Sequence, residues 1–138
     1  MRPLAVAATA ALALVVARAD VKVGDVFPPL TTAGVVALAG AELPATAGKV
    51  VLVDFWASWC TPCKLSFPWM SELHEQYASR GLRIVAIGLD KKDADARRFL
   101  AAHPAKFPVA MDPAAETAKL LAIQAMPTSF VVGADRSV

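Results

Sequence analysis

Residues 53–64, Val-Asp-Phe-Trp-Ala-Ser-Trp-Cys-Thr-Pro-Cys-Lys, carry both cysteines of the chain at the point where an apolar strand is expected to give way to a helix. The exposed start of a helix presents unpaired N–H groups and a partial positive charge, which stabilise a thiolate on the first cysteine more than on the second. This placement predicts a redox-active disulfide pair, with Cys60 as the nucleophile and Cys63 as the resolving thiol.

Regular elements alternate around that stretch. Residues 50–56 form a valine-rich apolar run typical of a central strand covered on both faces. A helix is expected over residues 61–79, kinked by Pro68 in its interior and closed by Gly81, and a second apolar strand over residues 82–89. The buried stripe of this helix consists of apolar and aromatic residues at spacings of three and four, namely Phe67, Met70, Leu73 and Tyr77.

The rest of the chain continues the alternation. We expect an amphipathic helix over residues 93–103, a strand over 107–111, a helix over 113–123 and a strand over 129–132. Upstream of the cysteines, a hairpin is expected through residues 35–38. Consecutive strand-helix units predict parallel strand pairing and a fold of the α/β class.

The first 19 residues are typical of a secretory signal peptide. Arg2 supplies a short positive segment, residues 4–16 are almost wholly apolar, and Ala17-Arg18-Ala19 fits a small-x-small cleavage site. The run is shorter than the ~18 apolar residues of a membrane span, so an uncleaved anchor is the weaker alternative. We therefore assign residues 1–19 to a leader, residues 20–138 to one domain, and the protein to the periplasm or another exported compartment.

The charge of the chain argues against a nucleic-acid partner. The sequence has 14 Lys and Arg residues against 12 Asp and Glu residues, a formal net charge of +2. Removal of Arg2 and Arg18 with the leader leaves 12 of each and a net charge of zero. A neutral domain has no general attraction toward polyanions.

Several motifs, taken in this order, resemble the thioredoxin superfamily and, within it, the exported TlpA/ResA/DsbE-like thiol-disulfide oxidoreductases. The motifs are Asp54 in its apolar strand, Phe55-Trp56-Ala57, Trp59-Cys60-Thr61-Pro62-Cys63-Lys64, Pro68 five residues after Cys63, and Met126-Pro127-Thr128 before a strand. The resemblance covers about residues 23–138. It implies a thioredoxin-like three-layer sandwich around a central mixed sheet.

The resemblance also implies site residues beyond the cysteine pair. Pro127 would have a cis peptide bond and lie beside the nucleophilic sulfur, and the backbone of Met126 would offer an edge to an extended substrate. Asp54 would lie buried behind the resolving thiol, with a raised pKa, and accept its proton when the mixed disulfide is resolved. Trp59 would flank the site and shield it.

The sequence departs from the family pattern at three places. Ser66 stands three positions after the second cysteine, where many exported members carry an acidic residue. Ile87 stands where thioredoxin itself has a lysine facing the buried aspartate, so Asp54 should be harder to ionise. The family fold also continues beyond the position of Val138, and we expect a domain that is incomplete at its C-terminus, lacking the last strand and the closing helix.

The function implied by the resemblance is thiol-disulfide exchange, in which Cys60 attacks a protein disulfide, Cys63 resolves the mixed disulfide, and the protein leaves oxidised. The substrates would be disulfide-containing exported proteins, such as apocytochrome c during haem attachment. A membrane thiol reductant would then restore the dithiol. We expect a monomer that uses no cofactor and binds no metal or nucleic acid.

Other functions are compatible with parts of this pattern. A zinc site with His74 and His103 is disfavoured, because zinc usually takes a second closely spaced ligand pair and these histidines lie far apart. A peroxiredoxin-type enzyme would want a threonine three residues before its reactive cysteine, where Ala57 precedes Cys60. A structural cysteine pair, or a non-catalytic module that binds peptide or metal along the edge at residues 126–127, remains as an alternative.

Overall fold

The computed structural model describes residues 21–30, 35–38, 43 and 48–138. The signal peptide predicted for residues 1–19 lies outside these residues. Within the described ranges, every helix is too short or too polar to cross a membrane.

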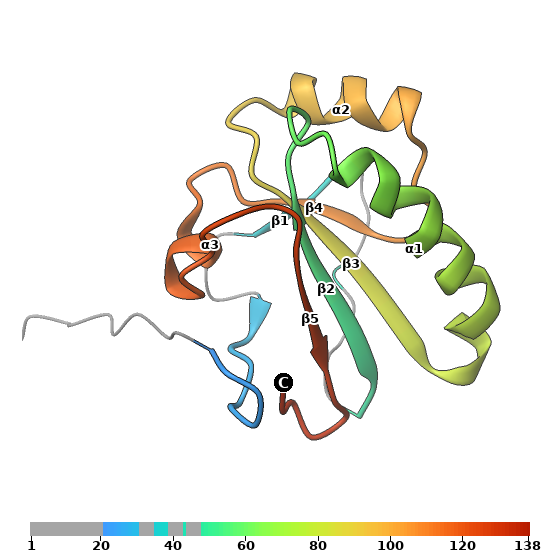
Figure 1. The fold of residues 1–138 in the computed structure, drawn as a ribbon, viewed down its shortest axis with the longest axis vertical. Coiled ribbons are helices and arrows are strands. Elements are labelled where there is room, and N and C mark those ends of the chain that lie inside the picture. Colours follow the sequence, from blue (N-terminus) through green and yellow to red (C-terminus); the bar gives the residue numbers. More distant parts are fainter. Residues whose placement is uncertain (1–20, 31–34, 39–42, 44–47) are drawn as a thin grey trace, which may run out of the picture.

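A mixed β-sheet forms the centre of the fold (Figure 1). Its strands in the described part of the chain are β1 (Val36–Ala37), β2 (Val50–Trp56), β3 (Leu82–Gly88), β4 (Val109–Met111) and β5 (Thr128–Val132). The spatial order is β1-β4-β3-β2-β5. The three inner strands are parallel, and each edge strand is antiparallel to its neighbour. The predicted α/β class with a central mixed sheet is therefore confirmed.

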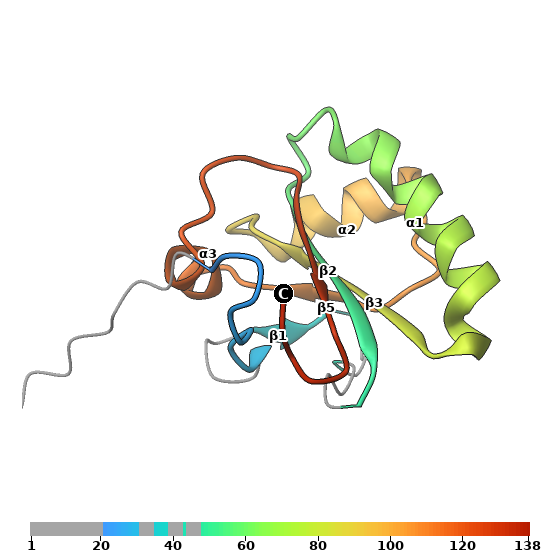
Figure 2. The ribbon, with the colours of Figure 1, turned by 60° about the horizontal axis from the view of Figure 1, so that its bottom comes forward.

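Helices lie on both faces of this sheet. The two longer helices, α1 (Cys63–Tyr77) and α2 (Asp93–Ala102), pack on one face, and α3 (Glu116–Leu120) lies with residues 21–30 on the other (Figures 1 and 2). The result is the three-layer arrangement that the resemblance implied. Both cores are built from strand side chains that alternate between the two faces.

The alternation along β2 decides which side chains face α1. Leu52 and Trp56 pack in the core under α1 and α2, together with both cysteines. Val53 and Phe55 pack in the opposite core, on the side of α3. Because successive strand residues point to opposite faces, Asp54 belongs to the face that carries the cysteines.

Three aromatic rings tie the end of β2 to both helices on that face. Trp56, Phe67 and Phe99 have ring centroids separated by 4.7 to 5.0 Å, and all three are buried. Packed aromatic pairs contribute about 0.5–1.5 kcal/mol each beyond the area they bury. The segment that follows Trp56 and carries the cysteines therefore starts from a firmly packed point.

Most predicted elements are present with shifted ends. The strand predicted over residues 50–56 has those limits, while the first long helix begins at Cys63 rather than at residue 61. This helix runs through Pro68 without a break and ends at Tyr77, where a 3₁₀ turn follows. Gly81 then adopts a φ of 100°, a conformation that suits glycine, and closes the helical segment as predicted.

The hairpin predicted through residues 35–38 is wrong. Val36 and Ala37 form an edge strand that pairs antiparallel with β4, in register with Met111 and Ala110. Among the described residues, its partner is thus a strand more than seventy positions away in the sequence. Pairing there covers backbone groups that β4 would otherwise present at the edge of the sheet.

The helix predicted over residues 113–123 is also shorter, spanning only Glu116–Leu120. Ala115 and Ala122 flank it with φ values of 54° and 51°, which interrupt the right-handed helical backbone. The buried Asp112 carboxylate accepts hydrogen bonds from three N–H groups in the first turn of α3, at 2.8 to 3.2 Å. This side chain starts the helix later than the apolar pattern indicated.

Candidate functional site

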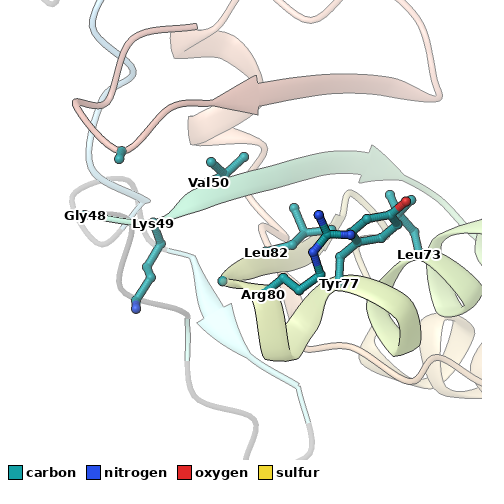
Figure 3. Close-up of a pocket in the computed structure, with 9 residues that line it drawn as sticks. Gly48, Lys49, Val50, Leu73, Tyr77, Arg80 and Leu82 are labelled. Atoms are coloured by element: carbon teal, nitrogen blue, oxygen red, sulfur yellow. The ribbon is translucent and has the colours of Figure 1, made fainter.

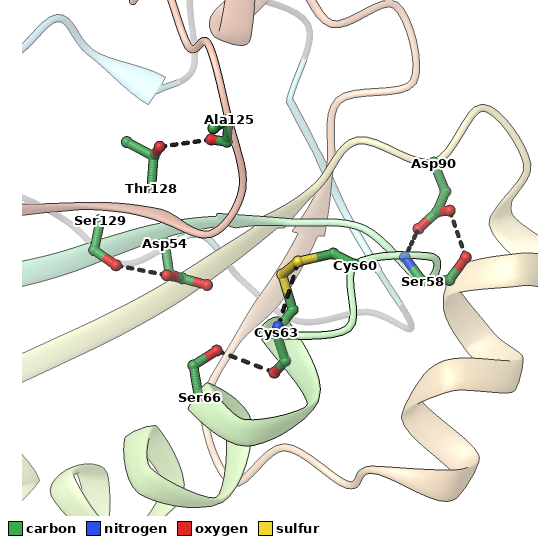
Figure 4. Close-up of a disulfide and its surroundings, with 9 residues drawn as sticks. All are labelled: Asp54, Ser58, Cys60, Cys63, Ser66, Asp90, Ala125, Thr128 and Ser129. Atoms are coloured by element: carbon green, nitrogen blue, oxygen red, sulfur yellow. Dashed lines mark hydrogen bonds between the residues drawn. A yellow bond between two sulfur atoms is a disulfide. The ribbon is translucent and has the colours of Figure 1, made fainter.

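The two cysteines are joined in a disulfide at the start of α1 (Figure 4). Cys63 is the first residue of the helix, and its backbone N–H donates to the Sγ of Cys60 at 3.3 Å. Cys60 keeps 4% of its surface exposed and Cys63 keeps none. An approaching disulfide therefore meets Cys60 first, and a donor is already in place beside the sulfur that would carry negative charge after reduction.

A buried aspartate holds the loop that leads to Cys60. The carboxylate of Asp90 accepts hydrogen bonds from the N–H and from the hydroxyl of Ser58, at 2.9 and 2.7 Å (Figure 4). Asp90 is 5% exposed, so this is a well-shielded pair of charge-assisted bonds. The arrangement fixes the turn between β2 and the disulfide.

Sequence reasoning missed Asp90, although a signal was present. Trp56 and Gly88 are paired across the parallel strands β2 and β3, and Ser58 and Asp90 each follow two residues later. Parallel strands end at the same edge of a sheet, where functional residues commonly lie. An acidic residue just beyond one strand and a serine just beyond its neighbour could have suggested a contact.

Asp54 is buried on the same face as the disulfide. Its side chain is 1% exposed, and in Figure 4 its carboxyl group extends toward the two sulfur atoms. The hydroxyl of Ser129 donates to Oδ1 at 2.6 Å, whereas Oδ2 has no hydrogen-bond partner among the described residues. Burial raises the pKa of Asp54 from its ordinary 3.8 to about 6, and the Ser129 hydrogen bond acts in the opposite direction.

The residue opposite Asp54 on β3 is Ala86, not Ile87 as the sequence comparison suggested. Ile87 is paired with Phe55 and packs in the core on the other face of the sheet. The assignment was wrong by one residue, which in a strand reverses the face. Ala86 carries no charge, so β3 contributes no cation beside the carboxyl at this position.

The Ser66 side chain bonds to the backbone of its own helix rather than to the Asp54 carboxyl. Its hydroxyl donates to the carbonyl oxygen of Cys63 at 3.0 Å, within the first turn of α1 (Figure 4). A hydroxyl that bonds back into its own helix is a common arrangement for serine. The side chain three residues after the second cysteine thus makes a local hydrogen bond.

The loop before β5 lies next to the disulfide region. The peptide bond between Met126 and Pro127 is cis, as the resemblance implied. Met126 packs against the core that contains both cysteines, and the hydroxyl of Thr128 donates to the carbonyl oxygen of Ala125 at 2.6 Å. Figure 4 shows this bond on the opposite side of the disulfide from the loop of Ser58.

A small apolar pocket connects that loop to Trp59. Its volume is about 360 Å³, and its lining includes Trp59, Leu89, Ile123 and Met126. Trp59 is 71% exposed, so its ring borders an open surface. Trp59 and Met126 therefore line one pocket, and Met126 also packs against the core that contains the disulfide.

A larger cavity of about 610 Å³ lies at the far end of α1, between Val50, Leu73, Tyr77 and Leu82 (Figure 3). The guanidinium group of Arg80 stacks 5.0 Å from the centre of the Tyr77 ring at its rim. The cavity is remote from the first turn of α1, which holds the disulfide. Its size alone does not indicate a function, and we do not assign the functional site to this cavity.

Throughout the described ranges, no three His, Cys, Asp or Glu side chains come together as a metal ion would require. The ring of His103 packs on Phe99 at 4.8 Å between centroids, and the two cysteines are bonded to each other. The structure thus does not bring His74 and His103 together with the cysteines in such a group.

Comparisons with known proteins agree on one family. The redoxin family model matches residues 22–138. The chain is 37% identical to the thiol-disulfide oxidoreductase ResA of Bacillus thuringiensis subsp. konkukian over 97 residues, which are 70% of this chain and 56% of that protein. It is 30% identical to ResA of Bacillus subtilis over 70% of this chain and 54% of that protein. The chain thus spans about half the length of the curated relatives it matches.

Solved structures give the same result for the fold. A putative thiol:disulfide interchange protein DsbE from Chlorobium tepidum superposes with a TM-score of 0.71 and 39% identity, covering 85% of this chain and 82% of that one. StoA from Bacillus subtilis gives a TM-score of 0.59 and 26% identity, with 66% and 70% covered. The thioredoxin-like architecture expected from the sequence is therefore confirmed.

Proposed function

The chain belongs to the redoxin family, with ResA/DsbE-like relatives, and from this premise we propose that it is a thiol-disulfide oxidoreductase that reduces protein disulfides. The proposal rests mainly on one observation. The Cys60–Cys63 disulfide lies at the N-terminus of α1, with the more exposed sulfur accepting a hydrogen bond from a backbone N–H. This environment stabilises a thiolate at Cys60 and leaves Cys63 shielded for the second step.

The proposed reaction begins from the reduced dithiol. The Cys60 thiolate attacks one sulfur of the substrate disulfide, forms a mixed disulfide and releases the other substrate sulfur as a thiolate. Cys63 then loses its proton and attacks the Cys60 sulfur, which expels the second substrate sulfur. Two electrons pass from the protein to the substrate, and the protein is left with the disulfide seen in the structure.

Asp54 is the proposed acceptor of the Cys63 proton. Its carboxyl is buried on the cysteine face, one of its oxygens is unpartnered among the described residues, and its pKa of about 6 leaves it mostly ionised at neutral pH. Asp54→Asn should slow resolution of the mixed disulfide near pH 7, on the order of 100-fold, while first attack proceeds. Rapid-quench analysis of the mixed disulfide separates the steps. An unchanged resolution rate removes Asp54 from the mechanism.

We assign substrate contact to the surface formed by Trp59, Met126 and Pro127. The support is the pocket that joins Trp59 to Met126 and the position of this loop beside the core of the two cysteines. An extended client segment could lie along this loop and place its disulfide at Cys60. The proposed clients are disulfide-containing exported proteins, with apocytochrome c as the example that the resemblance suggests.

The cellular setting is part of the proposal. The leader pattern in residues 1–19 supports export to the periplasm or an equivalent space, where cytosolic reductants are absent. A membrane thiol reductant would then regenerate the Cys60–Cys63 dithiol after each cycle. We propose that the protein acts as a monomer and without a cofactor.

The test is redox cycling compared with a matched cysteine variant. Wild type should reduce insulin disulfides in the presence of dithiothreitol, and Cys60→Ser should not. Cys63→Ser should accumulate a mixed disulfide with a client peptide, because the first attack succeeds and the second cannot. Wild-type activity no greater than that of Cys60→Ser would refute the enzyme proposal and favour a binding module.

A further inference from the structure

The hydroxyl of Ser129 lies where it controls the buried carboxyl of the proposed mechanism. We propose that Ser129 is a positioning residue for Asp54: it holds Oδ1, so that Oδ2 is the oxygen left to take the proton of Cys63. The inference deepens the proposed function and rests on it. Neither residue lies near the other in sequence, since 75 positions separate them.

Strand pairing creates the contact. β5 runs antiparallel to β2, and Ser129 is the residue directly opposite Asp54. Directly opposed residues point to the same face of a sheet, so the hydroxyl reaches the carboxyl at 2.6 Å (Figure 4). The neighbouring hydroxyl, that of Thr128, is engaged with the carbonyl oxygen of Ala125 instead. On β5, Ser129 is thus the side chain positioned to donate a hydrogen bond to Asp54.

The two carboxyl oxygens are not equivalent. Oδ1 accepts the Ser129 hydroxyl, while Oδ2 is buried and has no hydrogen-bond partner among the described residues. A buried polar atom without a partner is uncommon and calls for a reason. An oxygen with no donor is the one with a lone pair free to accept a proton. In Figure 4 the carboxyl lies between Ser129 on one side and the disulfide on the other.

The hydroxyl also affects the charge state of Asp54. A donor to a carboxylate stabilises the ionised form, and the Ser129 bond lowers the pKa of Asp54 against the larger effect of burial. Around this carboxyl, β3 contributes Ala86, β5 contributes Ser129, and the cysteine side contributes the Cys60–Cys63 disulfide. The causes of the Asp54 pKa shift are burial, which raises the pKa, and the Ser129 hydrogen bond, which lowers it. Ser129 is therefore the group that opposes the effect of burial.

Removing the hydroxyl should leave a smaller fraction of Asp54 ionised, and so able to accept a proton, at weakly acidic pH. We expect Ser129→Ala to raise the pKa of Asp54 above that of wild type and to move the pH dependence of mixed-disulfide resolution upward by the same amount. For an upward move of one pH unit, the ionised fraction at pH 6 falls from about one half to about one tenth, a roughly fivefold slower resolution. Ser129→Thr restores a hydroxyl and should restore both quantities.

The experiment combines two measurements on the full chain. Carbon-13 NMR titration of the Asp54 carboxyl in the oxidised protein gives its pKa without turnover, and rapid quench gives resolution rate against pH in the reduced protein. Thr128→Val is the matched control for the titration, because it removes a hydroxyl bond from the same strand that does not involve Asp54. We expect its carboxyl pKa to equal that of wild type.

Two results would overturn the inference. One is an Asp54 pKa in Ser129→Ala that matches wild type, and the other is a raised pKa with an unmoved pH profile of resolution. If wild type reduces insulin no faster than Cys60→Ser, the proposed activity fails. The titration of Asp54 then still shows whether the Ser129 hydroxyl bonds to its carboxyl. Failure of the proposed activity and failure of the Ser129 role are thus recorded by different measurements.

Discussion

Replacement of Asp54 by asparagine should stabilise the oxidised protein in a strongly pH-dependent way. Folding raises the pKa of this carboxyl from 3.8 to about 6, chiefly by burial. A carboxyl with a raised pKa favours the folded state only while it is protonated. The contribution is therefore fully present below about pH 3.8 and is lost as the pH rises through about 6. Asparagine does not titrate, so the variant does not undergo this particular loss of stability across the pH window.

The size of the effect follows from the two pKa values. A difference of about two pH units, at about 1.36 kcal/mol for each unit, corresponds to roughly 3 kcal/mol of unfolding free energy. The difference in unfolding free energy, Asp54→Asn minus wild type, should thus be about 3 kcal/mol larger at about pH 8 than at about pH 3.5. This is a large fraction of the stability of a small domain.

The assay is urea unfolding of both oxidised proteins, followed by tryptophan fluorescence and far-ultraviolet circular dichroism across this pH range at constant ionic strength. The difference between the two proteins isolates Asp54, because every other titrating group is shared. The reasoning would be refuted if the difference in unfolding free energy stayed constant with pH. It would also be refuted if the variant lost stability on going from acid to alkaline conditions relative to wild type.

Other predictions concern the loop, the client surface and the packing of the sheet. Asp90→Ala should lower the unfolding free energy by about 2 kcal/mol and Ser58→Ala by about 1 kcal/mol, because only the first change removes both hydrogen bonds; equal losses in denaturant unfolding would contradict this. Trp59→Ala should lower kcat/KM by about tenfold for a protein disulfide and by less for a small aromatic disulfide, and parallel losses would argue against client contact. Gly88→Ala should cost about 1–3 kcal/mol, since its Cβ would lie 2.7 Å from the Met111 Sδ; an unchanged melting temperature would show that the sulfur moves aside.

Local patterns were sufficient for most of the secondary structure. The apolar run at residues 50–56 and the periodic apolar positions of the first long helix follow from burial, which imposes a period of about two or 3.6 residues on each element. The third helix was shorter than predicted because a side chain outside it, that of Asp112, bonds its first turn. The strand at Val36–Ala37 was misjudged because its partner is distant in sequence.

Local sequence was enough to identify a candidate redox site. Two cysteines separated by two residues at a strand-to-helix junction indicate a redox pair, because the start of a helix favours a thiolate. Asp54 and Pro127 were found through their resemblance to known motifs. None of this reasoning identified the partners of Asp54 or the anchor of the cysteine loop.

Those contacts depend on the tertiary structure. The register of β2 against β5 places Ser129 opposite Asp54, and its register against β3 places Ala86 there instead of Ile87. A shift of one residue would reverse every face, and the register is set by long-range packing rather than by local sequence. The same strand ends bring Asp90 to Ser58. The sequence therefore indicated which groups could react, and strand register brought Ser129 to Asp54 and Asp90 to Ser58.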